Sequence, residues 1–183
     1  PTRQGHKDGG KWLCDIANAT SHSSSREVIL SLGGNNQYEF ERSMAAHGPP
    51  GVPMHTYDCT VAHPRVPAAL RDRLTFHQTC VGAFDGHDSA GRRFVTWRTL
   101  IAELGFPTVR LLKLDIEGHE RAALWEMFAS ASTTTASSSF DDGLPTQISL
   151  ELHANTMDAS GYYSHSGRRL TTLGELAMLA TLW

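Results

Sequence analysis

Two acidic residues follow the central apolar run of the chain and carry its clearest chemical signal. The run Leu111–Leu114 predicts a buried strand of a parallel sheet, and Asp115 and Glu117 come directly after it. Gly118 permits a tight turn, and 119–129 has the apolar spacing of a helix. An open α/β sheet forms its ligand crevice where strands end and helices begin, so we expect these carboxylates to face a crevice. Solvated acids at an ordinary turn are the alternative interpretation.

A second polar pair lies near the end of the predicted strand Gln147–His153, which carries Glu151 and His153. Strand side chains alternate between faces, so residues two apart point the same way. We therefore expect Asp115 and Glu117 to share one face of their strand, and Glu151 and His153 to share one face of theirs.

A glycine turn follows the strand predicted at Val28–Leu32. Gly33, Gly34, Asn35 and Asn36 form this turn, and the residues after it, 37–44, have helical spacing. This arrangement brings backbone N–H groups and a helix N-terminus up to a cofactor. The chain lacks the G-x-G-x-x-G fingerprint, so glycines that serve only the geometry of the turn are the alternative.

The next strand, predicted at Met54–Tyr57, ends at Asp58. In a nucleotide-binding half-sheet, an acid at this position accepts hydrogen bonds from ribose hydroxyls, whereas a turn or helix cap is the simpler role. The stretches 74–77 and 80–83 predict a third strand region, and 96–104 predicts the helix that precedes the central strand.

The alternation of buried strands and helices predicts an α/β fold with a mostly parallel sheet covered by helices on both faces. The first and fourth strands should be neighbours, because crossovers are right-handed. The 183 residues suit a single domain, 1–183. Residues 130–143 are mostly Ser, Thr and Ala and predict a low-complexity insertion, and 170–182 predicts a helix.

Composition narrows the functional classes. The formal net charge of −3 gives no support for a nucleic-acid surface, and no apolar run is long enough to predict a membrane span. Three cysteines without a CxxC pair argue against a disulfide scaffold and weakly favour a reducing compartment. The localisation is otherwise unknown.

The segment Leu112–Glu120 resembles the LKxDxEGxE signature of FkbM-type S-adenosylmethionine-dependent methyltransferases. Weaker matches in the right order are similar to a eukaryotic, methyltransferase-like branch and extend the resemblance from about Gly9 to His153. These matches are Asp8–Trp12 with Cys14, Leu32-Gly33 followed by Phe40-Glu41, Tyr57-Asp58, and Leu150–His153.

The resemblance implies a Rossmann-like class I methyltransferase fold with S-adenosylmethionine as cofactor. By position, the glycine turn would meet the methionine part, Asp58 the ribose, and the residues after the third strand the adenine. The implied cofactor-binding residues are Gly33, Gly34, Asn35, Glu41, Asp58, Val81, Gly82 and Asp115.

The implied catalytic residues are Asp115, Glu117 and His153. Methyl transfer to a hydroxyl needs an in-line nucleophile and a base for its proton, and any of the three suits that task. Strand-end carboxylates with one histidine also suit a divalent cation that lowers the pKa of the hydroxyl, although we assign no metal ligands from the sequence.

Two functions follow from the resemblance. The first is O-methylation of a small-molecule or sugar-like hydroxyl; the second is a catalytically inactive module in a larger assembly. A nicotinamide-dependent enzyme is a third, weaker possibility, because the dinucleotide fingerprint is missing. The strand pair that normally closes a class I methyltransferase sheet is not recognisable before Trp183, so we expect a C-terminally incomplete domain or a protein partner that covers the open sheet edge.

Overall fold

A computed structural model of the 183-residue chain describes most of the region between Lys11 and His153. The described residues are 2–4, 11–14, 26–105, 107–132 and 144–153. The helix predicted at 170–182 lies outside them.

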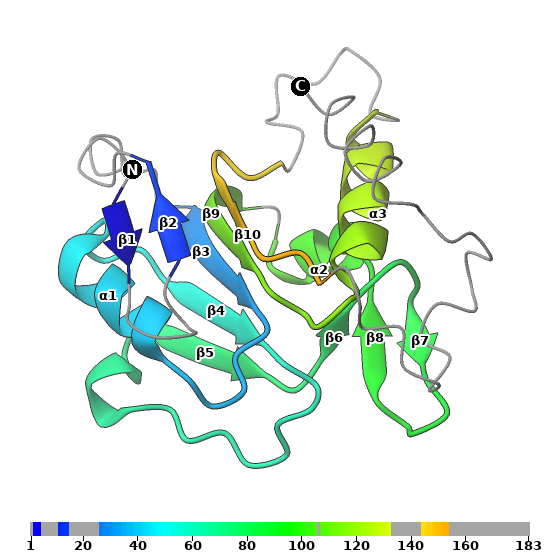
Figure 1. The fold of residues 1–183 in the computed structure, drawn as a ribbon, viewed down its shortest axis with the longest axis horizontal. Coiled ribbons are helices and arrows are strands. Elements are labelled where there is room, and N and C mark those ends of the chain that lie inside the picture. The colour runs from blue at the N-terminus through cyan, green and yellow to red at the C-terminus, as the bar shows by residue number, and fades with distance from the viewer. Residues whose placement is uncertain (1, 5–10, 15–25, 106, 133–143, 154–183) are drawn as a thin grey trace.

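A five-stranded sheet, parallel at every pairing, forms the centre of the fold, in the order β10-β9-β3-β4-β5 (Figure 1). The predicted parallel sheet is therefore confirmed. The first and fourth of its strands along the chain, β3 and β9, are neighbours as predicted. Its strands are β3 (Glu27–Leu32), β4 (Met54–Tyr57), β5 (Leu74–His77), β9 (Thr108–Leu114) and β10 (Ile148–Leu150).

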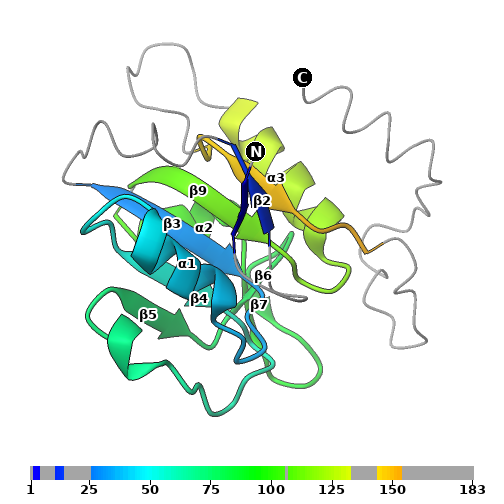
Figure 2. The same ribbon diagram turned by 60° about the vertical axis from the view of Figure 1, so that its left-hand side comes forward.

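Helices pack on both faces of this sheet, as the strand sequences predict (Figure 2). β3 is buried along its whole length and its side chains alternate between two cores. Leu30 contributes to the core that holds residues of α2 (Trp97–Glu103) and α3 (Glu120–Ser132). Ile29 contributes to the opposite core, which holds Phe40 and Met44 of α1 (Glu39–His47).

The stretch 80–83 does not extend the central sheet, which corrects the prediction of one third-strand region. β6 (Cys80–Val81) instead pairs in parallel with β8 (Arg93–Val95), and β7 (Gly86–His87) pairs antiparallel with β8. The chain leaves the central sheet after β5 and forms this small three-stranded sheet before it enters α2.

A hairpin at the N-terminal side lies against β10. β1 (Thr2–Gln4) and β2 (Lys11–Leu13) pair antiparallel. The Ser149 hydroxyl of β10 donates a hydrogen bond to the Trp12 carbonyl of β2 at 3.2 Å. Lys11, the first residue of β2, is buried, and its side chain binds Glu151, the residue that follows β10.

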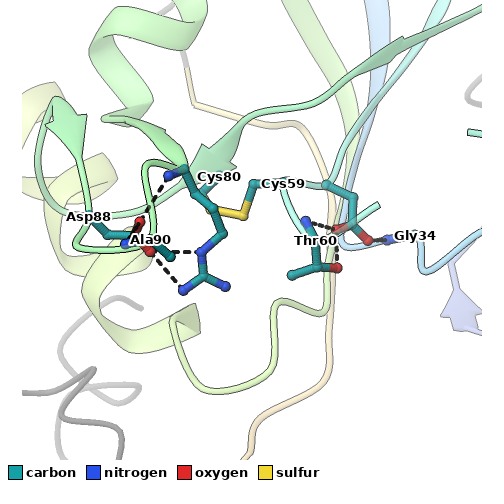
Figure 3. The surroundings of a disulfide bond; sticks show 8 residues. Gly34, Cys59, Thr60, Cys80, Asp88 and Ala90 are labelled. Carbon is teal, nitrogen blue, oxygen red and sulfur yellow. Dashed lines mark hydrogen bonds and ion pairs between the residues drawn. A yellow bond between two sulfur atoms is a disulfide. The ribbon is translucent and has the colours of Figure 1, made fainter. Parts of the chain in front are cut away.

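Cys59 and Cys80 form a disulfide, with their Cα atoms 4.8 Å apart (Figure 3). The expectation against a disulfide scaffold did not foresee this single bond, which an odd number of cysteines still permits and which leaves Cys14 free and exposed. The bond joins the loop after β4 to the start of β6, two segments that are 21 residues apart.

Two helix boundaries differ from the prediction. α1 begins at Glu39, two residues later than expected, because Asn35 and Asn36 adopt left-handed φ angles of 43° and 57° that extend the turn. α3 continues to Ser132, so the first residues of the predicted 130–143 insertion are helical; the remainder lies outside the described residues. None of the described helices has the length and apolarity that a membrane crossing requires.

Candidate functional site

The ends of four parallel strands meet in one row, which we call the carboxyl edge. The Gly33 N–H donates to the last carbonyl of β4 at 2.9 Å. The Asp115 N–H donates to the last carbonyl of β3, and the Glu151 N–H donates to the last carbonyl of β9, each at 3.0 Å. The polar residues that follow β3, β4, β9 and β10 are therefore brought together by the sheet itself.

Close approaches within the protein require glycine at position 33 and leave little room for a side chain at position 34. Gly33 has a φ of 83°, and a Cβ built on it would lie 1.6 Å from the Asp115 carbonyl oxygen. A Cβ on Gly34 would lie 3.0 Å from the Thr56 methyl group. Tight packing of β3 against β9 thus accounts for Gly33 without a ligand, as the geometric alternative proposed.

Asp58 is bound by the protein's own donors. One carboxylate oxygen accepts from the Gly34 and Asn35 N–H groups at 2.9 and 2.7 Å. The other accepts from the Thr60 N–H and hydroxyl at 2.8 and 2.6 Å. Burial raises the pKa of Asp58, but these hydrogen bonds outweigh it and hold the pKa below 3.8. A carboxylate offers about four acceptor positions, so a ribose hydroxyl would have to displace one of these bonds.

We expected Asp115 and Glu117 to share one face of a strand, but neither residue belongs to a strand, because β9 already ends at Leu114. Glu117 has a left-handed φ of 54° and belongs to the turn into α3. The two acids still approach one atom: His153 Nε2 lies 3.9 Å from Asp115 Oδ1 and 3.5 Å from Glu117 Oε2. The expected shared face was wrong, whereas the two carboxylates do converge.

Glu151 and His153 also lie beyond the end of their strand, β10, and they belong to the same group. Glu151 Oε1 is 3.8 Å from His153 Nε2. We call Asp115, Glu117, Glu151 and His153 the acid–histidine cluster. The side chains of Asp115 and His153 are 19% and 18% exposed, whereas that of Glu117 is 78% exposed, so the cluster opens toward solvent on the Glu117 side.

Two lysines approach the cluster from the protein side, and the sequence reasoning missed both. Lys11 Nζ lies 2.9 Å from Asp115 Oδ2 and also binds Glu151 Oε2. Burial lowers the pKa of Lys11, but its hydrogen bonds and the two negative charges outweigh this effect and raise it. Lys113 Nζ donates to the Gly33 carbonyl and is 3.8 Å from Asp115 Oδ2. A lysine inside the apolar run of β9 was a usable signal for Lys113, and the match at Asp8–Trp12 was a weaker signal for Lys11.

Glu120 is a further residue that the sequence reasoning did not assign to the site. Its side chain is 1% exposed and accepts from the N–H groups of Ile116 and Gly118 at 2.9 Å each. It also binds His153 Nδ1 at 2.9 Å. An ionised carboxylate only accepts, so Nδ1 is the donor and Nε2 faces the other acids. Burial lowers the pKa of His153, but the Glu120 bond and the charges around it raise it above 6.5.

The remaining predicted cofactor residues lie in the interior. Glu41 is 1% exposed; one carboxylate oxygen accepts from the Thr56 hydroxyl at 3.1 Å, and the other has no hydrogen-bond partner among the described residues. Val81 is part of the core, and a Cβ on Gly82 would lie 3.2 Å from the Phe94 ring. Their roles near adenine stay predictions.

The chain matches no protein-family model, and neither curated proteins nor solved structures give a match. Its chemistry therefore has to be inferred from the site alone. The site combines acids that can accept protons, a histidine fixed by a buried carboxylate, and donor atoms of Asp115, Glu151 and His153 that all lie within 4.8 Å of one another.

Proposed function

We propose that the protein is an S-adenosylmethionine-dependent methyltransferase that methylates a hydroxyl of a small or sugar-like acceptor, with a Rossmann-like fold of the FkbM type. The observation that carries this proposal is the strand order. β3 lies between β4 and β9, so its glycine turn lies at the point where the direction of strand addition reverses. Open α/β sheets bind ligands at this point.

Glu41 supports a cofactor beside the glycine turn. One of its buried oxygens has no hydrogen-bond partner in the part of the chain that the structure describes, and a cofactor hydroxyl or ammonium group would satisfy it, since buried acceptors are rarely left without a partner. Glu41 binds Thr56, which lies against Gly34. Asp58 fits a ribose only if one of its four hydrogen bonds, to the 34–35 turn or to Thr60, is given up, so Glu41 is the better acceptor for a cofactor.

S-adenosylmethionine would supply a methyl group on a sulfonium, which needs little covalent assistance. The task of the chain is to hold the acceptor hydroxyl and remove its proton. His153 Nε2, when the ring is neutral, and Glu117 Oε2 lie 3.5 Å apart, and either can accept this proton. The raised pKa of His153 favours its protonated form near neutrality. Methylation that uses its neutral ring should therefore accelerate as pH rises above 6.5.

Calorimetric titration of the folded protein with S-adenosylmethionine tests this proposal. We expect saturable binding to the unaltered protein. Glu41→Gln should weaken this binding several-fold, because it replaces the carboxyl group by an amide, whereas Glu39→Gln on the exposed side of the same helix should not. A folded sample that gives no binding heat at high protein concentration contradicts the proposal.

A catalytically inactive binding module is the second candidate, and a specific observation favours it. The acceptor positions of the Asp58 carboxylate are already occupied by hydrogen bonds from the protein. Lys11 and Lys113 also lie beside the Asp115 carboxylate and offset part of its negative charge, where a substrate would bind. If the protein is such a module, titration with S-adenosylmethionine should give no binding heat, either with the unaltered protein or with Lys11→Met.

A further inference from the structure

We propose that Asp115, Glu151 and His153 form a binding site for a divalent transition-metal ion, with one coordination position left open. This proposal does not depend on methyl transfer. Each residue offers one ligand atom, and these atoms lie within 4.8 Å of one another. The three residues follow two neighbouring strands, β9 and β10, so the sheet fixes their spacing.

The distances around His153 Nε2 suit such an ion. Asp115 Oδ1 is 3.9 Å away and Glu151 Oε1 is 3.8 Å away. A metal with bonds of about 2.1 Å keeps tetrahedral ligand atoms roughly 3.4 Å apart. The three ligand atoms lie within 4.8 Å of one another, so side-chain rotations that move them by up to about 1.4 Å relative to one another would bring them to coordination distances.

Lys11 does not occupy this position. It binds Asp115 Oδ2 and Glu151 Oε2, whereas the atoms that face His153 are the other oxygen of each carboxylate. The lysine therefore holds the two carboxylates side by side and leaves one oxygen of each directed at the imidazole. Each carboxylate can accept from both sides, because it has about four acceptor positions.

Glu120 distinguishes this group from a loose collection of surface acids. The carboxylate is buried, fixed by two backbone N–H groups, and bound to His153 Nδ1. Metal-binding histidines almost always donate their second ring N–H to such a partner, which fixes the tautomer and orients the ligand nitrogen. Here the bond directs Nε2 at the carboxylates of Asp115 and Glu151.

The donor set indicates the class of ion. Two carboxylates and one imidazole match Zn²⁺ or Mn²⁺, whereas Mg²⁺ and Ca²⁺ prefer oxygen ligands alone. Three protein ligands with an open position are typical of catalytic rather than structural zinc sites. In the proposed methyltransferase, the acceptor hydroxyl would take the open position, and Glu117, whose Oε2 is 3.5 Å from Nε2, would accept its proton.

Titration of the chelator-treated full chain with ZnCl₂, followed by calorimetry, tests the site. We expect one equivalent to bind and CoCl₂ to produce the visible absorption of a histidine- and carboxylate-coordinated ion. His153→Ala and Glu151→Gln should each weaken binding at least about tenfold, and Glu120→Gln about 10–100-fold through the orientation of His153. His63→Ala, at an exposed histidine outside the cluster, is the matched control and should bind like the unaltered protein.

Zinc that binds His153→Ala and His63→Ala with equal affinity would overturn the proposal, and so would the absence of binding to the unaltered chain. Circular dichroism establishes that each variant is folded. If His153→Ala does not fold, the zinc affinity of Glu151→Gln tests the proposal instead, because the Glu151 side chain is 42% exposed and the variant should fold. Zinc binding without S-adenosylmethionine binding would leave this site standing and remove the proposed methyltransferase function, so the two proposals fail separately.

Discussion

The carboxyl edge has two acidic regions that look alike in the sequence and differ in the structure. On the β4 side, the carboxylate of Asp58 is bound by three backbone N–H groups and one hydroxyl. On the β9–β10 side, Asp115 and Glu151 are bound by the side chain of Lys11 and face His153. Both regions place an acid directly after a parallel strand.

The difference teaches which acids are available for chemistry. Backbone donors are fixed by the loops that carry them, so Asp58 can exchange only its bond to the Thr60 hydroxyl without a change in the backbone. Side-chain partners can move by rotation about a few bonds, so the acids near His153 can exchange theirs for a ligand. Burial and position after a strand do not distinguish the two cases; the identity of the bonding partners does.

The strongest test concerns Gly33, which lies between the two regions. Gly33→Ala should destabilise the protein by about 4 kcal/mol or more, because the new methyl group would overlap the Asp115 carbonyl at 1.6 Å. Gly51→Ala is a matched control with a similar φ of 75° and no atom within 4 Å, and it should cost only about 1–2 kcal/mol. Urea denaturation measures both; equal losses would show that the clash is relieved by movement of β9.

The disulfide belongs to the β4 side alone. Replacement of Cys59 and Cys80 by alanine together should lower the free energy of unfolding by about 3 kcal/mol, because the closed loop spans 21 residues. Cys14→Ala, at the free exposed cysteine, should have no measurable effect. If the double variant binds zinc like the unaltered chain but loses affinity for S-adenosylmethionine, the two regions serve different ligands.

Asparagine substitutions compare the two acids directly. Asp58→Asn should cost about 2–3 kcal/mol, because an amide accepts at only one of its two polar atoms and its NH₂ group would face a donor. Asp115→Asn should cost less than about 1 kcal/mol, because Lys11 keeps its bond to Glu151. Chemical denaturation provides both values. A larger loss at Asp115 would reverse the assignment of structural and exchangeable acids.

The pH dependence of stability should also differ between the two regions, and this is the smallest of the expected effects. The pKa of His153 is raised above 6.5, so its charged form stabilises the fold fully below pH 6.5, and this contribution is lost as pH rises through the folded-state pKa. The loss should be about 1 kcal/mol or less and absent in His153→Gln. The pKa of Asp58 is lowered, so its contribution is present above pH 3.8 and disappears only as pH falls through its folded-state value. Denaturation curves at several pH values measure both windows.

The strands of the central sheet were predictable from sequence, because buried parallel strands read as short apolar runs. The run before Asp115 and the run before Gly33 both became strands of that sheet, and the polar residues after them lie on one edge as expected. The apolar pattern of one segment was therefore enough to predict that the segment forms a strand.

The partners of those polar residues were not predictable, because they come from distant segments. Lys11 meets Glu151 across 140 residues, and Glu120 meets His153 across 33. The backbone donors on Asp58 include the Asn35 N–H, which comes from a turn 23 residues earlier in the chain. The Cys59–Cys80 bond likewise depends on the departure of β6 from the central sheet.

The central position of β3 has a consequence for the order of assembly during synthesis. β3 pairs with β4 soon after both emerge, but its other neighbour, β9, begins only at Thr108. Until β9 is synthesised, one backbone edge of β3 has no strand partner. The pairing of β3 with β9 is therefore a late contact between segments that are distant along the sequence. Such contacts slow folding, so the ribosome-bound intermediate should be the form of this protein most dependent on chaperones.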